Sequence, residues 1–267
     1  MSENRPILTA SDISIVFGGL RAVSDLNMEL TKGELVGLIG PNGAGKTTVF
    51  NMLSGVYTPT SGQITYTDKK NRIHIVNKMS PAQLNKIGIA RTFQNIRLFG
   101  NLTVADNVRI AMHAQRKANP FHILFRTPKF RKDEEMMTNQ VRSLLKLFGL
   151  SEKESELAKN LPYGEQRKLE ICRALASQPQ ILLLDEPAAG MNPQETKELM
   201  ELISFIRKEF HLTILLIEHD MKLVMGICER IFVLNYGRLL ASGKPEEIQQ
   251  NPEVIKAYLG AEAASGK

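Results

Sequence analysis

A glycine-rich run at residues 40–47 has the clearest chemistry in the chain. Its sequence, GPNGAGKT, matches the pattern G-x-x-x-x-G-K-[ST] and follows the apolar segment Leu35–Ile39. Glycines let successive backbone N–H groups turn toward one point, where a helix beginning at Gly45 would also direct the positive end of its dipole. Lys46 adds a cation for the β and γ phosphates, and the Thr47 hydroxyl is a ligand for Mg²⁺. The run predicts a nucleotide-binding site.

Two adjacent carboxylates form a second candidate group. Asp185 and Glu186 directly follow the apolar segment Ile181–Leu184, which is typical of a buried strand. Ligands of α/β proteins bind beyond the carboxyl ends of parallel strands. Asp185 would there hold Mg²⁺ through its water shell, and Glu186 would orient a water molecule in line with the γ phosphate. Alone, the pair is equally compatible with an acidic loop; the phosphate-binding run favours the catalytic interpretation.

The spacing of apolar residues predicts the elements that position these groups. Strands are expected at Ile13–Phe17, Val23–Leu30, Leu35–Ile39, Gln63–Tyr66, Ile73–Val76 and Ile87–Thr92, as antiparallel hairpins with one parallel strand. Helices are expected at Val104–Ala114, Glu134–Phe148 and Gln166–Ala176. Strands at Ile181–Leu184, Thr213–Ile217 and Ile231–Leu234 then alternate with helices at Pro193–Glu209 and Met221–Cys228, and short helices follow Pro245 and Pro252. This alternation is typical of a parallel α/β sheet.

The composition is that of an ordinary folded protein. Of 267 residues, 43% are hydrophobic and 23% are charged, which excludes collagen-like and largely disordered chains. The longest apolar stretches fall far short of the roughly 20 residues that cross a bilayer, and the amino terminus does not resemble a secretory signal. Cys172 and Cys228 are too few for a disulfide framework. We therefore expect a soluble protein of the reducing cytoplasm.

The net charge of +6 is concentrated in the segment 115–132. It contains Arg116, Lys117, Arg126, Lys129, Arg131 and Lys132 and no acidic residue. The rest of the chain is balanced, which argues against the broad basic face that binds nucleic acid. The segment also contains three phenylalanines, so contact with an anionic membrane or partner surface and an ordinary solvated loop are both open interpretations. We interpret it as an insertion.

With two further motifs, the chain resembles the ATP-binding subunits of ABC transporters. The motifs are RTFQ at 91–94 and IEHD at 217–220, and the resemblance extends in order from Phe17 to His219. It implies an α/β fold of the P-loop NTPase class with a mixed central sheet, an antiparallel β subdomain and an inserted α-helical subdomain. One ABC ATPase domain would span residues 1–267. Its nucleotide-binding core would comprise 1–102 and 177–267, and its helical subdomain would comprise 103–176.

The resemblance implies which residues bind ATP. Phe17 would stack on adenine, although a single aromatic residue on a strand is also typical of a core. The phosphates would be held by Gly40, Pro41, Asn42, Gly43, Ala44, Gly45, Lys46, Thr47 and Thr48. Thr47, Gln94 and Asp185 would hold Mg²⁺.

It also implies a catalytic set of three side chains. Glu186 would activate the attacking water, and Gln94 would contact that water and Mg²⁺ and link the site to the membrane partner. A neutral His219 imidazole would bond the γ phosphate and hold Glu186 and the water in place.

The signature motif, at 161–166, departs from the family pattern. The usual LSGGQ is here LPYGE, so Pro162 replaces the serine and Gly164 is retained. In the family this motif closes on ATP bound by the other subunit, and the resemblance assigns that contact to Tyr163, Gly164 and Glu165. Asn192 replaces a second typical residue, an aspartate. These departures leave the activity of a homodimer open.

Three features are similar to one branch of the family, the longer ATPase of branched-chain amino acid uptake systems. They are the YGEQ sequence at 163–166, RTFQNIRLF at 91–99 followed by LTV at 102–104, and the basic insertion. The resemblance implies a peripheral subunit on the cytoplasmic face of the inner membrane that uses ATP and Mg²⁺. Its partners would be two permease subunits, a second ATPase subunit and, indirectly, a solute-binding protein, with no nucleic acid.

Other functions stay open at this point. The chain could energise another transporter, such as a urea importer or a lipopolysaccharide exporter, because the ATPase never touches the cargo. A soluble ABC ATPase acting on nucleic acid or ribosomes would usually have two fused ATPase units or a long coiled coil, and neither is present. A regulatory subunit that binds ATP without hydrolysing it is the third alternative.

Overall fold

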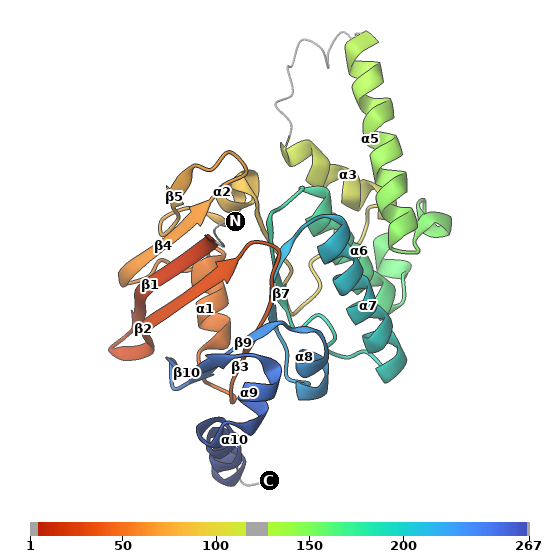
Figure 1. Ribbon diagram of the computed structural model, residues 1–267. Coiled ribbons are helices and arrows are strands. Elements are labelled where there is room, and N and C mark those ends of the chain that lie inside the picture. The colour runs from red at the N-terminus through yellow and green to blue at the C-terminus, as the bar shows by residue number, and fades with distance from the viewer. Residues whose placement is uncertain (1–4, 116–127, 266–267) are drawn as a thin grey trace.

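A six-stranded sheet has the strand order β10-β9-β3-β8-β7-β6. Its strands β3, β7 and β9 lie in the middle of the molecule (Figure 1). The structure, a computed structural model, describes residues 5–115 and 128–265. The strands are β3 (Leu35–Ile39), β6 (Ile89–Arg91), β7 (Ile181–Asp185), β8 (Thr213–Ile217), β9 (Arg230–Asn235) and β10 (Arg238–Gly243). All pair in parallel except β10, which is antiparallel to β9. The carboxyl ends of the parallel strands therefore share one edge of the sheet.

Both faces of this sheet are covered, which explains the continuous apolar runs in its strands. Successive residues of β7 enter different hydrophobic clusters. Leu182 and Leu184 pack with the helices of one cluster, whereas Ile181 and Leu183 pack with α1 (Lys46–Leu53) and a second sheet.

The second sheet is antiparallel and has the order β2-β1-β4-β5. Its strands are β1 (Pro6–Phe17), β2 (Leu20–Thr31), β4 (Ser61–Thr67) and β5 (Ile73–Ile75). Val49, Phe50 and Leu53 on α1 are fully buried in the cluster that contains residues of both sheets. The helix that follows the glycine-rich run is thus fixed between the two sheets.

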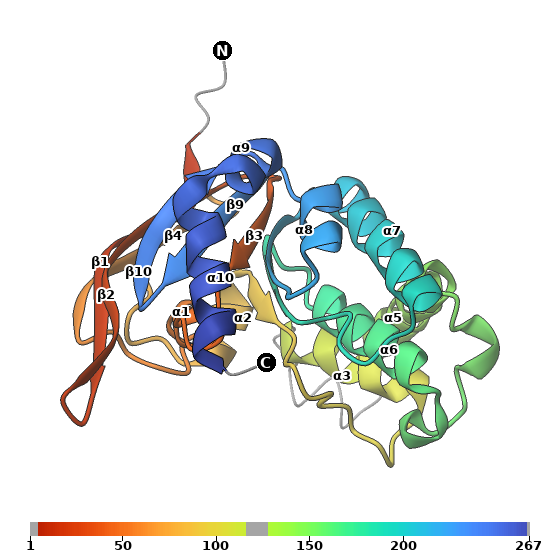
Figure 2. The ribbon, with the colours of Figure 1, turned by 90° about the horizontal axis from the view of Figure 1, so that it is seen from below.

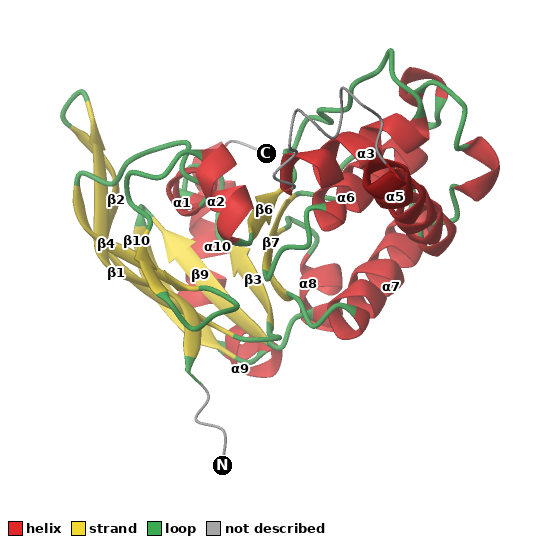
Figure 3. Ribbon diagram, turned by 90° about the horizontal axis from the view of Figure 1, so that it is seen from above, coloured by secondary structure: helices red, strands yellow, loops and turns green. Residues whose placement is uncertain are grey.

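The remaining helices gather on the opposite side of the molecule from the antiparallel sheet (Figure 3). They are α3 (Val104–Gln115), α5 (Pro128–Leu147), α6 (Tyr163–Ala176), α7 (Pro193–Glu209) and α8 (Met221–Ile227), with short 3₁₀ turns at Ser151–Lys153 and Ala158–Asn160. On the strand side, α2 (Pro81–Ile87) precedes β6, and α9 (Pro245–Gln250) and α10 (Pro252–Ser265) pack beside β10 (Figure 2). Across the described ranges, no helix combines the length and apolarity that a membrane span requires.

The expected fold class is confirmed, but some expected elements are wrong. A strand was expected to begin at Ile87, whereas α2 continues through that residue and β6 begins at Ile89. A capping box between Ser80 and Gln83 starts this helix, and Gly88, at φ +119°, ends it. Because β6 pairs in parallel with β7, the first part of the chain supplies two parallel strands rather than one.

Strand β10 was not expected. Its residues are mostly exposed or half-buried, so the apolar signal is weak. The hairpin that precedes it turns at Tyr236 and Gly237, which both have positive φ. Most of the basic segment, residues 116–127, lies outside the described residues. The subdomain boundaries at 102/103 and 176/177 stay predictions.

Replacing Gly40 is expected to disturb the turn between β3 and the glycine-rich run. Gly40 has φ +149°, and an added Cβ would lie 2.2 Å from the Leu234 carbonyl oxygen. We expect Gly40→Ala to lower the free energy of unfolding by about 2 kcal/mol and to weaken ATP binding, measured by thermal unfolding and by a fluorescent ATP analogue. Gly226→Ala in α8 is the control, because its Cβ meets nothing within 4 Å. Parent-like stability and affinity in Gly40→Ala would contradict this reading of the turn.

Candidate nucleotide-binding and catalytic site

Segments that are far apart in the sequence converge where the parallel strands end. The glycine-rich run follows β3, Gln94 follows β6, Glu186 follows β7 and His219 follows β8. They line one cavity of about 670 Å³, together with residues 42–48 and Tyr236. This is the edge at which ligands of parallel α/β sheets bind.

The glycine-rich run has the backbone geometry that a phosphate-binding loop requires. Gly43 and Gly45 have positive φ values of 77° and 99°, and α1 begins at the next residue, Lys46. The Lys46 side chain is buried, and its ammonium donates to the carbonyl oxygens of Gly40 and Pro41 at 2.7 and 3.0 Å. Burial lowers the pKa of Lys46, and the Glu186 carboxylate partly opposes that change.

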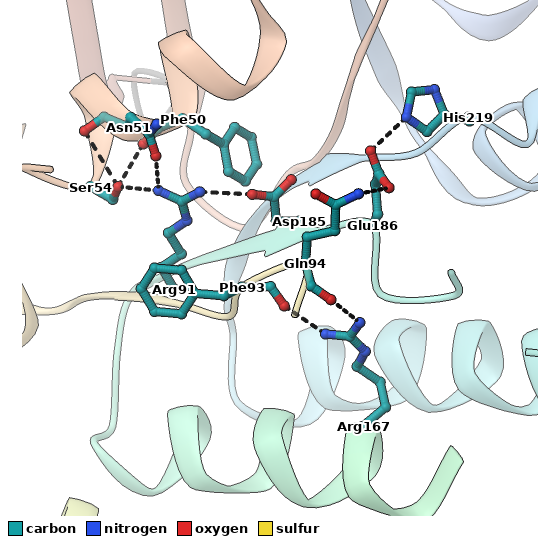
Figure 4. A network of polar contacts seen from close by, with 10 residues as sticks. All are labelled: Phe50, Asn51, Ser54, Arg91, Phe93, Gln94, Arg167, Asp185, Glu186 and His219. Atoms are coloured by element: carbon teal, nitrogen blue, oxygen red, sulfur yellow. Dashed lines mark hydrogen bonds and ion pairs between the residues drawn. The ribbon is translucent and has the colours of Figure 1, made fainter. Parts of the chain in front are cut away.

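Glu186 is held by the two other residues predicted to be catalytic (Figure 4). Its Oε2 accepts a hydrogen bond from Gln94 Nε2 at 2.8 Å, and its Oε1 lies 2.5 Å from His219 Nε2. With Glu186 ionised, the nitrogen that faces it carries the ring proton. The Glu186 backbone is in the left-handed region, at φ 47°, and its N–H donates to Ile217 at the end of β8. Such strain persists only where surrounding contacts impose it.

Asp185 lies at the end of β7, and its side chain is buried. Its Oδ2 accepts a 2.7 Å hydrogen bond from the Arg91 guanidinium. The predicted metal ligands are the Asp185 carboxylate, the Thr47 hydroxyl on the first turn of α1 and the Gln94 amide oxygen. All are hard oxygen donors, and Thr47 and Gln94 line the cavity. This donor chemistry fits Mg²⁺.

Phe17 and the signature residues are not among the residues that line this cavity, although Phe17 pairs across its hairpin with Leu20, which does line it. Phe17 is 43% exposed and packs edge-on against Tyr57, with ring centroids 5.2 Å apart. Tyr163, Gly164 and Glu165 form the first turn of α6. The Glu165 carboxylate accepts hydrogen bonds from the Lys153 ammonium. Their proposed roles toward adenine and toward a partner's ATP stay predictions.

The substituted position Asn192 is used locally as a helix cap. Its side chain accepts from the Glu195 backbone N–H at 2.9 Å, while the Glu195 carboxylate accepts from the Asn192 N–H at 3.0 Å. This capping box begins α7.

Sequence reasoning missed a buried carboxylate beside the histidine. Glu218 Oε1 accepts from the Ala188 N–H at 2.9 Å and Oε2 accepts from the His219 N–H at 3.3 Å. Burial raises the pKa of Glu218. The residue joins the end of β8 to the loop that follows Glu186. Its only sequence signal is its place between a buried strand and the histidine.

A second missed group lies on α6. Arg167 is fully buried and donates to the carbonyl oxygens of Phe93 and Gln94, each at 2.7 Å. It pairs with Glu170, which also accepts from the Arg97 N–H. Burial raises the pKa of Glu170, opposed by the Arg97 N–H and by Arg167. The segment around Gln94 is thereby fastened to α6. The sequence held one signal for this pair: Arg167 and Glu170 are three residues apart, which places them on one face of a helix.

Comparisons with known proteins decide the family. A family profile described as "ABC transporter" matches residues 23–189. The chain belongs to the ABC transporter family. A second profile, described as "Branched-chain amino acid ATP-binding cassette transporter", matches residues 238–264 of this ABC chain. Membership confirms the expected ABC resemblance and identifies an ATP-binding, ATP-hydrolysing subunit of a transport system.

The alignments with named relatives cover nearly the whole length of this chain. The high-affinity branched-chain amino acid transport ATP-binding protein LivG of Escherichia coli (strain K12) is 50% identical over 96% of this chain and 99% of its own. BraF of Pseudomonas aeruginosa, with the same description, is 46% identical over the same shares. The lipopolysaccharide export system ATP-binding protein LptB of Haemophilus influenzae is 31% identical over 95% of this chain and 97% of its own.

A comparison with solved structures leads to the same family. The ADP conformation of MJ1267, described as an ATP-binding cassette of an ABC transporter, has a TM-score of 0.80 at 27% identity. That comparison covers 96% of this chain and 99% of the other.

The lowered pKa of Lys46 predicts how ATP affinity depends on pH. The charged ammonium attracts phosphates, so affinity should be full while Lys46 is protonated and should fall as rising pH passes its lowered pKa, before the ordinary value of 10.5 is reached. Titrating a fluorescent ATP analogue from neutral to alkaline pH measures this decline, with circular dichroism verifying folding. Lys46→Ala should bind weakly with no such decline, and Lys46→Arg should keep its charge throughout. A parent affinity that stays constant up to the ordinary lysine range would refute the prediction.

Proposed function

We propose that this chain is the ATP-hydrolysing subunit of an ABC importer of branched-chain amino acids. The observation that carries the hydrolytic part is the Glu186 carboxylate, held between Gln94 and His219 at the edge where the phosphate-binding loop begins. The substrate class is supported by the carboxyl-terminal profile match and by LivG and BraF, because these relatives are described as branched-chain amino acid transport proteins.

Each side chain has a role that follows from its position. The backbone N–H groups of residues 40–47 and the Lys46 ammonium would bind the phosphates, for which Lys46 leaves the carbonyl oxygens of Gly40 and Pro41. Glu186 would accept a proton from the attacking water, and Gln94 and His219 would orient its carboxylate. Thr47, Gln94 and Asp185 would hold Mg²⁺, which neutralises phosphate charge when bound.

The adenine ring and a partner subunit would complete the site. Phe17 would stack on the base. Tyr163, Gly164 and Glu165, on the first turn of α6, would close on ATP held by a second ATPase subunit. Pro162 lacks a backbone N–H, so the partner's site would receive one hydrogen-bond donor fewer than in the usual motif. The backbone N–H of Gly164 would still be available. A second ATPase subunit with the usual signature motif would supply this chain's own ATP site with the full set of donors, which favours a heterodimer.

The complex would lie on the cytoplasmic face of the cell membrane. Two ATPase subunits would attach to two permease subunits, with a solute-binding protein acting on the other side. Loss of the γ phosphate would loosen the subunit interface, and the helices around α6 would pass that movement to the permeases.

Removing the proposed base should separate binding from hydrolysis. Glu186→Gln keeps the shape of the side chain, but it accepts hydrogen bonds through one oxygen instead of two and cannot accept the proton, so we expect turnover to fall by about 100-fold or more. ATP affinity should remain, and the ATP-bound dimer should accumulate in size-exclusion chromatography. Glu201→Gln, an exposed carboxylate on α7, is the matched control. Hydrolysis by Glu186→Gln at the parent rate would exclude Glu186 as base.

Transport is the test of the substrate class. We expect the tagged chain to be recovered from membranes with two permeases and a second ATPase, and proteoliposomes of that complex to accumulate labelled leucine when given ATP and the solute-binding protein. Lys46→Ala should abolish the accumulation. Uptake of urea instead of leucine, or recovery of the chain without permeases, would overturn the assignment.

A further inference from the structure

Arg91, at the end of β6, forms a buried ion pair that the proposed reaction does not yet explain. Its guanidinium lies 2.7 Å from Asp185 Oδ2, and the two side chains are 8% and 5% exposed. Removing two charges from water is costly unless they are well paired and further hydrogen-bonded. The pair is conspicuous because its carboxylate is a proposed metal ligand.

The other nitrogen of the Arg91 fork is anchored on the helix that follows the phosphate-binding loop. It donates to Asn51 Oδ1 and to Ser54 Oγ, each at 2.7 Å, and both residues belong to or directly follow α1. One guanidinium therefore joins β7 to α1 (Figure 4).

Two aromatic rings lie close to this guanidinium. Its central carbon lies 5.6 Å from the centre of the Phe50 ring and 5.0 Å from that of Phe93. Arginine suits this place because its planar fork bonds in two directions while it stacks on rings, whereas a lysine ammonium is a point charge that would reach fewer of these partners.

From this geometry we propose that Arg91 is a positioning residue for the magnesium site. It holds the Asp185 carboxylate in one orientation, and it fixes the distance between β7, which bears Asp185, and α1, which bears Thr47. Without Arg91, the buried Asp185 carboxylate would lose its partner and turn away from this position, which removes a metal ligand. The inference rests on the proposed function, in which Thr47 and Asp185 hold Mg²⁺.

The same segment carries Gln94, three residues after Arg91. Phe93 contributes its ring to Arg91 and its carbonyl oxygen to Arg167. Arg91 thus fixes the start of the segment that brings the Gln94 amide to Glu186. Loss of Arg91 would affect the metal ligands first and the catalytic carboxylate only through this segment.

The test measures metal dependence without turnover. A fluorescent ATP analogue is bound to the chain first in EDTA and then with increasing Mg²⁺, below the melting temperature of every variant. For Arg91→Met we expect the Mg²⁺ concentration at half effect to rise by about 10- to 100-fold, as when the partner of a metal ligand is removed. Binding in EDTA should change far less, and Arg91→Lys should be intermediate.

Two further variants separate positioning from general stability. Ser54→Ala removes one acceptor of Arg91 but leaves the Asp185 pair, so it should keep a near-parent Mg²⁺ requirement. In an Asp185→Asn background, Arg91→Met should add little, because the ligand it positions is already lost. If Arg91→Met and Arg91→Lys fold and keep the parent Mg²⁺ requirement, Arg91 is only structural and the proposal fails. A parent chain that shows no Mg²⁺ effect would instead refute the proposed metal site itself.

Discussion

The position of the Glu186 carboxylate depends on the parallel pairing of β3, β6, β7 and β8. Parallel strands end at one edge, so four segments distant in sequence meet there. Glu186 takes a left-handed backbone conformation at that edge, and its carboxylate is bonded on both sides by Gln94 and His219. The strain is sustained because each neighbour is itself anchored, His219 through the buried Glu218 and Gln94 through Arg167.

Buried charges join the elements that must act together. Arg91 connects β7 with α1, and Arg167 connects α6 with the segment around Gln94. Apolar packing could hold these elements equally well, but it would not set the direction of a carboxylate or an amide. Because α6 begins with the signature residues, Arg167 supplies a direct contact between the proposed partner-facing turn and the residue that bonds Glu186. Movement of α6 would therefore reach Gln94.

Two departures from the usual family motifs, Asn192 and Pro162, affect their helices differently. Asn192 forms a complete capping box with Glu195, so its replacement of aspartate is compatible with a well-formed α7. Pro162 occupies the N-cap position of α6, where no side chain supplies a cap. The helix still presents the N–H of Gly164, where an added Cβ would lie 3.0 Å from the Glu195 carboxylate. Of these two departures, only Pro162 bears on the proposed heterodimer, because it removes a backbone donor from the turn that would face the partner's ATP.

The phosphate-binding run, the carboxylate pair after a buried strand and most helices and strands are predictable from the sequence, because periodicity and glycine spacing are local properties. The resemblance of the sequence to a known family predicted the fold class. It also placed Gln94 and His219. The sequence did not reveal β10, whose exposed residues give little apolar signal, or the limits of β6, which pairing with β7 decides. Tertiary structure alone decided which charges are buried together. Arg91 and Asp185 are 94 residues apart, and Arg167 and Gln94 are 73 apart, so only the folded arrangement of sheet and helices could make them partners.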